Sequence, residues 1–359
     1  MKIPLISLIL PVRNESVYID HALSAILKQD YPADRMETLI ADGMSTDNTR
    51  QIIHDFSTLH SQLKIQILDN LGKIVPTGMN VALREAKGEI IIRVDGHCNI
   101  APDYVRKCVE HIQNDGVDGV GGPMESIGDT QMAKAIAIGM SSPFGVGNSA
   151  FRTTSGKSML ADTVPFPAYT RQIIERAGFY DEELVRNQDD EYNYRIRELG
   201  GKILLADDVR STYFSRTSLK GLWRQYFQYG FWKVRVLQKH PRQMSPRQFI
   251  PPIFVLSLIV STLFALFSFF ILHAKCSSFI IVLSSFIPLL YLLANLLASI
   301  WTAIKKGVIL HPSSCILPVI FAILHLSYGL GFLAGLFKFW NRWGDKIGKT
   351  PVWSNEPSG

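Results

Sequence analysis

The sequence predicts an α/β domain with a mostly parallel sheet, followed by an α-helical membrane domain. Up to about residue 210, short apolar runs that suit strands alternate with helical patterns. Beyond Phe249, three long stretches contain no Asp, Glu, Lys or Arg. A chain of 359 residues is long enough to form both domains.

The alternation in the first domain consists of four strands separated by three amphipathic helices. Each predicted strand is a short β-compatible run, and each predicted helix has apolar residues on one face. Such an alternation is typical of a parallel sheet with helices on its faces. The strands are expected over Ile6–Leu10, Glu37–Ala41, Lys64–Leu68 and Glu89–Val94, and the helices over Glu15–Gln29, Thr49–Leu59 and Pro76–Ala86.

Polar clusters follow the predicted strands. Arg13-Asn14-Glu15 follows the first strand, Asp42-Gly43 the second, and Asp95-Gly96-His97 the fourth. Ligands of open parallel sheets bind beyond the carboxyl ends of the strands. The sequence therefore predicts a binding site at this edge.

The uncharged stretches Phe249–Leu272, Ser277–Ala303 and Ser313–Phe337 each exceed the roughly 20 residues that cross a bilayer. Three in succession, with short loops between them, favour membrane spans over a buried helical core. A third crossing would place Lys338, Arg342, Lys346 and Lys349 outside, against the positive-inside rule. The third stretch is therefore left open between a span and a re-entrant or membrane-lying segment.

Before the first span, Leu219–Leu237 combines an apolar, aromatic helical face with basic residues that lie largely off it. This pattern favours a helix in the headgroup layer over a helix that only packs on the catalytic domain. The predicted organisation is a catalytic domain at 1–215, an interfacial helix and linker at 216–248, transmembrane helices at 249–340 and a basic tail at 341–359.

Composition excludes several classes of protein. Hydrophobic residues make up 47% and charged residues 19%, which does not fit a disordered chain. The four cysteines form no CxxC pair, so a zinc ribbon or a disulfide scaffold is not expected. The net charge of +6 concentrates beside the apolar stretches, which indicates a membrane surface and no nucleic-acid partner.

Single motifs allow two interpretations each. Asp42 is either part of a turn, with Thr46 or Asp47 capping the next helix, or a hydrogen-bond acceptor for a base or ribose. Asp95-x-His97 is a strand-ending turn or a cation site, since both side chains suit Mn²⁺. Gln188-Asp189-Asp190-Glu191 places acids before a helix expected over Tyr192–Leu199, either to complement the helix dipole or to supply a general base.

The order and spacing of the motifs resembles glycosyltransferase family 2, over roughly Ile6 to Gly201. The set comprises Pro11-Val12-Arg13-Asn14-Glu15, Asp42-Gly43-x-Ser45-Thr46-Asp47-x-Thr49, Asn70-x-Gly72-Lys73, Gly78-x-Asn80, Asp95-x-His97 with Pro102, and Gln188-Asp189-Asp190-Glu191 with Arg195 and Gly200. The entry motif, the Asp-Gly-His triplet and the basic aromatic segment are most similar to the ExoA-like subgroup of succinoglycan-type exopolysaccharide glucosyltransferases.

The resemblance implies a GT-A fold and a role for each matching position. Asp95 and His97 would hold Mg²⁺ or Mn²⁺ on the diphosphate of a nucleotide sugar, and Asp189 would be the base that deprotonates the acceptor hydroxyl. Gln188, Asp190 and Arg195 are possible supporting residues. The nucleotide-sugar would be bound by Pro11, Val12, Arg13, Glu15, Asp42, Lys73, Asn80 and Asp95.

Three positions depart from the family pattern. His97 stands where an aspartate is usual, so the metal preference can differ. Gln188 replaces the glutamate of the usual Glu-Asp pair. The Gln-x-x-Arg-Trp motif of processive synthases is absent, because Phe231 stands in the place of its arginine in Gln228–Trp232. Transfer of a single sugar is therefore expected, and chain extension is not.

The expected activity is inverting transfer of glucose from UDP-glucose, or of another UDP-sugar, to a polyprenyl-diphosphate-linked saccharide in cell-surface polysaccharide biosynthesis. The enzyme would be a multi-pass protein of the cytoplasmic (inner) membrane, with its catalytic domain in the cytoplasm. A degenerate scaffold that binds a nucleotide sugar without turnover is the alternative. A solute transporter is disfavoured, because the apolar stretches hold few polar residues beyond Asn295 and His325.

Overall fold

The computed structural model describes residues 3–147, 149–153, 156–271 and 277–345, with side chains described outside 268–285. These residues form two compact units. The first contains 3–125 and 149–214, and the second contains 126–147 and 215–345. The division after Phe214 adjoins the predicted boundary at 215. Residues 126–147 differ from the prediction, because they join the second unit although they lie within the expected catalytic segment.

An eight-stranded sheet forms the centre of the first unit, in the order β3-β2-β1-β4-β9-β6-β10-β8. β1 pairs in parallel with β2 and β4, β2 with β3, and β6 with β10, whereas β9 and β8 pair antiparallel to their neighbours. The predicted α/β architecture is confirmed. The strands are β1 Ile6–Val12, β2 Met36–Asp42, β3 Lys64–Asp69, β4 Ile90–Arg93, β6 Gly119–Gly121, β8 Met159–Leu160, β9 Ala168–Thr170 and β10 Ile203–Leu205.

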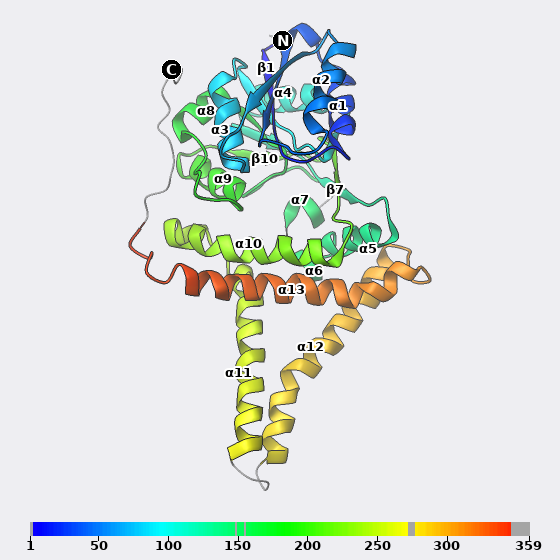
Figure 1. Ribbon diagram of the computed structural model, residues 1–359, viewed down its shortest axis with the longest axis vertical. Helices are drawn as coiled ribbons and strands as arrows, with labels where there is room; N and C mark the ends of the chain where they lie inside the picture. Colours follow the sequence, from blue (N-terminus) through cyan, green and yellow to red (C-terminus); the bar gives the residue numbers. More distant parts are fainter. Residues whose placement is uncertain (1–2, 148, 154–155, 272–276, 346–359) are drawn as a thin grey trace. The chain divides into compact units, whose positions relative to one another are not determined.

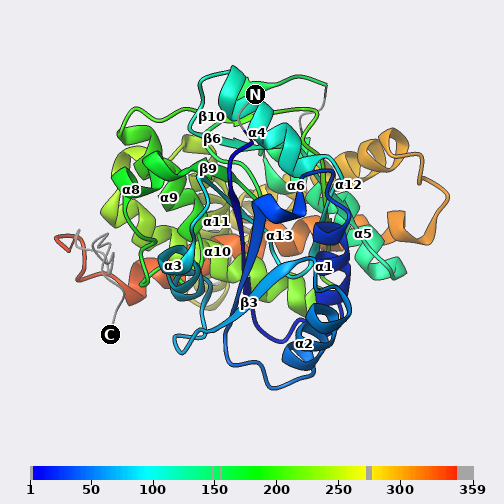
Figure 2. The ribbon, with the colours of Figure 1, turned by 90° about the horizontal axis from the view of Figure 1, so that it is seen from above.

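Helices cover both faces of this sheet (Figure 2). Successive residues of β1 point to opposite faces. Leu8 and Leu10 pack with residues of α1, α2 and α4, and Ile9 packs with residues of α3, α8 and α9. The central strands are thus buried on both sides, as is usual in parallel sheets. The helices are α1 Ile19–Leu27, α2 Thr49–Leu59, α3 Val75–Glu85, α4 Tyr104–Asn114, α8 Arg171–Ala177 and α9 Gln188–Glu198, with a 3₁₀ turn at Ala33–Arg35.

The segment between residue 95 and α9 contains elements for which the sequence pattern made no prediction. Its strands have two to four residues, too few for an alternating pattern to be recognised. Two of them, β5 and β7, form a second sheet together with β11, which follows α9, in the order β5-β11-β7. The additional elements are β5 Cys98–Ile100, β7 Met124–Ile127, β11 Ser211–Phe214 and the short helix α7 Ala150–Thr153.

The second unit is helical. α11 and α12 run side by side away from α10, and α13 runs alongside α10 at a large angle to both (Figure 1). Buried residues of α5, including Ile136 and Met140, pack with α10, α12 and α13, which explains why residues 126–147 belong to this unit. The helices are α5 Gln131–Met140, α6 Pro143–Val146, α10 Leu219–Lys239, α11 Ile250–Ile271, α12 Ser277–Lys305 and α13 Pro312–Lys338, with 3₁₀ turns at Pro241–Gln243 and Pro246–Phe249.

Within the described part of the chain, three helical segments are long and apolar enough to cross a membrane: Pro246–Phe267, Phe286–Lys305 and Pro312–Lys338. They match the three predicted stretches. Only 11% of the most apolar window of the first segment is buried, compared with 22% in the second and 44% in the third. Large apolar side chains of α11 and α12, such as Leu263 and Leu297, are therefore exposed where a water-soluble protein would bury them. These features identify a membrane protein.

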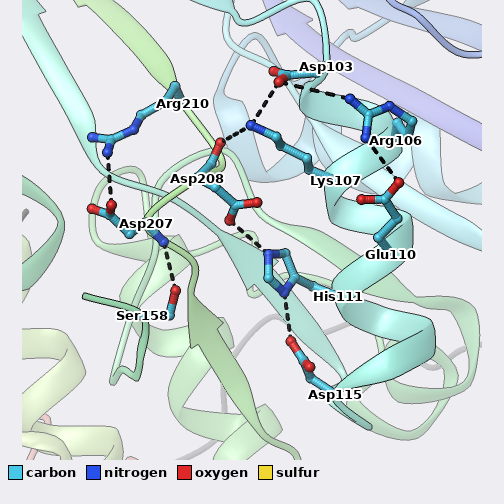
Figure 3. Close-up of polar contacts among 10 residues, drawn as sticks. All are labelled: Asp103, Arg106, Lys107, Glu110, His111, Asp115, Ser158, Asp207, Asp208 and Arg210. Atoms are coloured by element: carbon cyan, nitrogen blue, oxygen red, sulfur yellow. Dashed lines mark hydrogen bonds and ion pairs between the residues drawn. The ribbon is translucent and has the colours of Figure 1, made fainter. Parts of the chain in front are cut away.

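A charged network on the surface of the first unit surrounds His111 (Figure 3). His111 Nδ1 lies 2.6 Å from an Asp115 oxygen, and Nε2 lies 2.8 Å from Asp208. Burial alone would lower the pKa of His111, but the hydrogen bonds and charges of these two aspartates raise it above its usual value. The network ties α4 to the loop between β10 and β11.

We expect this network to make stability depend on pH. The pKa of His111 is higher in the folded state than in the unfolded state. The stabilisation that His111 contributes is therefore complete below its unfolded-state pKa of about 6.5, and it is lost as pH rises through its folded-state pKa. In detergent, the thermal midpoint of the wild-type protein should therefore exceed that of His111→Gln by the largest margin at pH 6. The difference between the two midpoints should be smaller at pH 9. His54→Gln, at an exposed histidine on α2, is the control; a gap that widens with pH contradicts this account.

Candidate functional site

The candidate site lies at the carboxyl ends of the parallel strands. From β1 the chain moves outward to β2 and β3, and then returns to place β4 on the other side of β1. The crevice at such a reversal of strand order is the usual ligand site of an open α/β sheet. Residues 13–15 leave β1 at this point and residues 94–97 leave β4. Two of the predicted polar clusters thus flank one crevice.

Asn14 joins the loop after β1 to the loop after β2. Its φ of 55° lies in the left-handed region, which asparagine tolerates better than most residues. Its backbone N–H donates to Ser45 Oγ at 2.9 Å, and its Oδ1 accepts from the N–H of Thr46 at 2.8 Å. Ser45 Oγ in turn donates to Asp42 Oδ1 at 2.5 Å. The two loops therefore form one continuous rim.

Asp42 is fully buried at the end of β2. Its carboxylate accepts the backbone N–H of Ser45 and lies 3.4 Å from a guanidinium nitrogen of Arg50. The turn predicted as one alternative is thus present. Direct contact of Asp42 with a nucleotide stays a prediction.

Asp47 lies two residues before α2; the N-cap position is Asn48, and not Thr46 or Asp47 as predicted. Its Oδ1 accepts from Thr49 Oγ1 at 2.6 Å and from the Thr49 N–H at 3.1 Å, while its Oδ2 accepts from the Ser16 N–H at 3.2 Å. Slight burial acts to raise the pKa of Asp47, but these hydrogen bonds lower it to about 2. The charged carboxylate thereby fixes both loops of the rim.

Lys73 and Arg13 form an exposed basic part of the rim. Lys73 has a φ of 60°, and its carbonyl accepts from Arg13 Nη1 at 3.4 Å. Asn70, which is buried, holds the same loop by accepting from Thr77 Oγ1 at 2.8 Å and donating to the Ile74 carbonyl at 2.9 Å. Two cationic side chains at the edge of the crevice suit an anionic ligand.

Glu15 and His97 lie within hydrogen-bonding distance across the crevice. His97 Nδ1 is 3.0 Å from Glu15 Oε1, and both side chains are mostly buried. Gly96 permits this approach, because a Cβ at this position would lie 3.0 Å from Val12 Cγ1 and 3.1 Å from the Glu15 side chain. The contact brings together two predicted site residues that lie 82 positions apart.

Arg93, at the end of β4, links the two aspartates to which sequence reasoning assigned the chemistry. Its Nε and Nη2 each lie 2.9 Å from Asp95 Oδ1, and its Nη1 donates to Asp189 Oδ1. The Arg93 side chain is only 9% exposed, so this guanidinium is held inside the domain. Asp95 and Asp189, from distant parts of the chain, thus share one buried cation.

The two aspartates experience this environment differently. Burial alone would raise the pKa of Asp95, but the charge of Arg93 outweighs it and holds the pKa below its usual value. Burial raises the pKa of Asp189, and Arg93 offsets this effect only in part. Asp95 is therefore a fixed anion, while Asp189 is a stronger proton acceptor than an ordinary aspartate.

α9 begins four residues earlier than predicted, which brings the acidic residues into its first turn. Asn187, with a φ of 62°, makes the sharp change of direction before the helix. Gln188 is buried, and its Nε2 donates to Asp189 Oδ2 at 3.3 Å. The glutamine that replaces the usual glutamate of the family thus donates a hydrogen bond to the candidate base.

Arg195 and Asn80, both predicted site residues, bind the protein itself. Arg195 Nε lies 2.7 Å from Glu191 Oε1, and its Nη2 donates to the Phe179 carbonyl at 2.9 Å. Asn80 is buried, and its amide donates to the Tyr180 carbonyl at 2.9 Å and accepts the Tyr180 N–H at 2.8 Å. Both side chains therefore hold the segment before α9, which indicates that they act by positioning it.

A small cavity of about 10 Å³, room for one water molecule, adjoins Arg93 on the α3, α8 and α9 side of the sheet. Tyr169, Tyr180 and Tyr192 form much of its wall, and the rings of Tyr180 and Tyr192 stack with centroids 4.0 Å apart. These rings and the cavity lie against Arg93 on the side of the sheet that α3, α8 and α9 cover. The guanidinium therefore has little freedom to leave the two aspartates.

Comparisons with known proteins agree with this architecture. A family model described as Glycosyl transferase family 2 matches residues 7–181. The succinoglycan biosynthesis protein ExoA of Rhizobium meliloti (strain 1021) is 31% identical over 235 residues, which cover 65% of this chain and 70% of that protein. The chain belongs to glycosyltransferase family 2.

Two further similarities extend over nearly the whole glycosyltransferase. A Methanococcus voltae protein, named as a dolichyl N-acetyl-α-D-glucosaminyl phosphate 3-β-D-2,3-diacetamido-2,3-dideoxy-β-D-glucuronosyltransferase, is 26% identical over 339 residues, covering 93% of this chain and 97% of that protein. The structure of a Pyrobaculum calidifontis mannosyltransferase in complex with GDP-Man and Mn²⁺ covers 93% of this chain and 88% of its own, with a TM-score of 0.58 and 18% identity. This structural similarity supports the GT-A fold.

The residues of the glycosyltransferase fit a divalent cation whose coordination shell is completed by the substrate. Among the described residues no group of three or more His, Cys, Asp or Glu side chains could hold a metal. Asp95 and His97 offer one carboxylate and one imidazole, a donor pair compatible with Mn²⁺. Metals in phosphoryl sites commonly take one or two protein ligands and complete their shell with substrate phosphates. The donor set therefore fits a cation that binds together with a diphosphate.

Arg93 is the site residue that sequence reasoning missed. A signal was available, because it is the only charged residue of the apolar run Ile90–Val94. A charged side chain at the end of a strand buried on both faces requires a partner. The partner Asp189 is 96 positions away, so its identity depended on the fold.

Proposed function

We propose that this glycosyltransferase transfers one glucose from UDP-glucose to a polyprenyl-diphosphate-linked saccharide at the cytoplasmic face of the inner membrane. The reaction would invert the anomeric carbon and serve exopolysaccharide biosynthesis. The observation that carries the proposal is the pairing of Asp95 and Asp189 through Arg93 at the carboxyl edge of the sheet. It brings a fixed anion and a strong proton acceptor to one crevice.

In the proposed reaction, the acceptor oxygen forms a bond to the anomeric carbon as the bond from that carbon to the diphosphate breaks. The acceptor hydroxyl gives its proton to Asp189, whose raised pKa suits a general base. Attack from the face opposite the diphosphate inverts the configuration. A divalent cation held by Asp95 and His97 would supply positive charge for the leaving diphosphate. Arg13 and Lys73 would attract the anionic donor to the rim.

The acceptor class rests on the membrane helices and on the named relatives. The Methanococcus voltae relative is named for a dolichyl-phosphate-linked sugar, and the Rhizobium meliloti relative for succinoglycan biosynthesis. A lipid-linked saccharide in polysaccharide assembly fits both names. The exposed apolar faces of α11 and α12 would hold the chain at the membrane in which such an acceptor resides.

A donor screen tests the proposal. Membranes containing the protein would be incubated with lipid extract and with radiolabelled UDP-glucose, UDP-galactose, UDP-N-acetylglucosamine, UDP-glucuronate or GDP-mannose. We expect label to enter the organic phase from UDP-glucose, with the β-linkage that inversion of an α-linked donor produces. Transfer from a different donor would refute the assigned sugar, and an α-linked product would refute inversion.

The scaffold alternative has one observation in its favour: Arg93 already engages the carboxylates of both Asp95 and Asp189. A scaffold would bind UDP-glucose and release no UDP in the presence of acceptor. Measurement of free UDP by a coupled assay in the same membranes separates the two functions. Release that depends on the lipid extract supports the enzyme, and binding without release supports the scaffold.

A further inference from the structure

We propose that α13 lies in the plane of the membrane, with α10 beside it, and that only α11 and α12 cross the bilayer. The α10–α13 pair contacts the lipids of one leaflet, at the level where the headgroups meet the acyl chains. This inference concerns the lipid-binding surface of the second unit and is independent of the sugar that is transferred. It decides between the alternatives that the sequence left open for the third apolar stretch.

The first argument is the close parallel packing of α10 and α13 (Figure 1). At Gly230, an added Cβ would lie 2.0 Å from the Tyr328 carbonyl oxygen, and at Gly331 it would lie 2.1 Å from the Phe227 carbonyl oxygen. A third glycine, Gly335, would place a Cβ 2.5 Å from the Phe231 carbonyl oxygen. The two helix backbones thus touch over several turns, as small residues permit.

The contact continues to the ends of both helices. Leu222, near the start of α10, packs with Leu317 and Phe321, near the start of α13. At the other end, Gln238 Nε2 donates to the Phe339 carbonyl at 2.7 Å. The helices run in the same direction along their full contact, so they must share one orientation relative to the membrane.

The second argument is the charge of α10. A helix carrying many basic residues is strongly disfavoured as a span, since each charged side chain is costly at the bilayer centre. An amphipathic basic helix is instead suited to the interface. Because α13 is packed along α10, it shares this location despite its apolar sequence. Of the five basic residues of α10, Lys220 and Arg224 are exposed and available to headgroups, whereas Lys233, Arg235 and Lys239 are buried within the protein.

The third argument is that two crossings place most of the basic residues that flank the helices on one side, and only Lys275, between α11 and α12 in the sequence, on the other. Arg242 and Arg247 precede α11, Lys305 ends α12 and Lys306 follows it, and Lys338 ends α13. With α13 in the plane, these groups all face the same compartment, as the positive-inside rule requires. A third crossing would separate Lys338 from the others.

Exposed tryptophans support a single headgroup layer. Trp301, near the end of α12, is 52% exposed, and Trp340, just after α13, is 71% exposed. The Lys305 ammonium lies 5.1 Å from the Trp301 ring centroid. Tryptophan beside lysine is typical of the membrane–water interface. Both helix ends therefore carry the features of the same interface.

Site-directed labelling tests the inference in the full chain. With Cys276 and Cys315 replaced by serine, single cysteines are introduced at three exposed positions: Thr217, before α10; Leu310, between α12 and α13; and Asn341, after α13. Cys98 and Cys108 are buried and are retained. A variant that keeps native Cys276, between α11 and α12 in the sequence, marks the opposite face. Vesicles of known orientation are treated with an impermeant maleimide.

We expect the cysteines at 217, 310 and 341 to react from one face and Cys276 from the other. Reaction of the residue-341 cysteine from the same face as Cys276 would overturn the proposal, because α13 would then cross the bilayer. Failure of the residue-341 cysteine to react in intact vesicles of either orientation, with reaction only after detergent is added, would also overturn it, because that position would then lie inside the membrane.

Spin-label depth gives a second, independent measurement. Val319 and Phe337 are exposed positions on α13 that lie 18 residues apart, or about 27 Å along a helix. If α13 lies in the plane, labels at these two positions should have similar depths in the membrane. If α13 spans the membrane, the two depths should differ by most of the ~27 Å. Phe286 and Ile304 on α12, also 18 residues apart, are the matched control pair, for which a large depth difference is expected. Depths on α13 that differ as much as those on α12 would contradict the in-plane placement.

Discussion

Replacing Asp189 by asparagine should lower kcat for sugar transfer by about 10²- to 10⁴-fold, the usual contribution of a general base. The amide cannot accept the proton of the acceptor hydroxyl, although it keeps the size of the side chain. Binding of the donor should change little, because the rim formed by Asn14, Ser45 and Lys73 is untouched. Initial rates at saturating donor, together with UDP binding by calorimetry, check the prediction.

Two variants on the same helix make this test specific. Asp190→Asn removes the adjacent carboxylate and should reduce kcat much less than Asp189→Asn does. Glu198→Gln removes a charge at the exposed end of α9 and should leave the rate unchanged. If Asp190→Asn is the more damaging change, the base has been assigned to the wrong aspartate.

Replacing Arg93 by methionine should affect both stability and the pH profile. The change leaves Asp95 and Asp189 without their shared cation, and loss of one partner of a buried ion pair costs about 3–5 kcal/mol. We expect about 2–3 kcal/mol here, because the aspartates retain partial access to water. Without the lowering effect of Arg93, the pKa of Asp189 rises further, so the acid limb of the kcat/KM profile moves to higher pH.

Arg106→Met is the matched control for this experiment. Arg106 also contacts carboxylates, those of Asp30, Asp103 and Glu110, but it lies at the surface with 41% of its side chain exposed. Figure 3 shows its contacts with Asp103 and Glu110. Exposed ion pairs contribute about 0–1 kcal/mol, so this variant should unfold nearly as the wild type does and keep its pH profile. An Arg93 variant that behaves like the Arg106 variant would show that the buried pairing has no role in positioning Asp189.

Much of the fold could be predicted because local patterns are long in particular segments. The expected helix over Thr49–Leu59 has the bounds of α2. The strand around Leu8 starts as predicted and ends two residues later, and the strand around Leu39 is longer by one residue at each end. In these segments apolar periodicity and turn residues agree with the final packing. The strands between residue 95 and α9 could not be predicted, because they are short and pair with strands distant in the sequence. For example, β9 pairs with β4, and β6 pairs with β10.

The candidate site was predicted in part. The motifs named Asp95, His97 and Asp189, but Arg93 was recognised only when two separate carboxylates were found on one guanidinium. Asn80 and Arg195 matched family motifs, yet their hydrogen bonds hold the segment before α9. A motif gives the type and order of residues, whereas hydrogen-bond partners depend on how the chain folds back.

From the sequence alone followed the family, the α/β class, the edge of the sheet that carries polar residues, and the presence of three long apolar segments. These properties depend on residues close together in the chain, so composition and periodicity are sufficient to establish them. Only the tertiary structure revealed the Arg93 bridge and the packing of α13 along α10. Both depend on contacts between residues about 100 positions apart, and the glycines that allow α13 to approach α10 have no distinctive meaning until the partner helix is known.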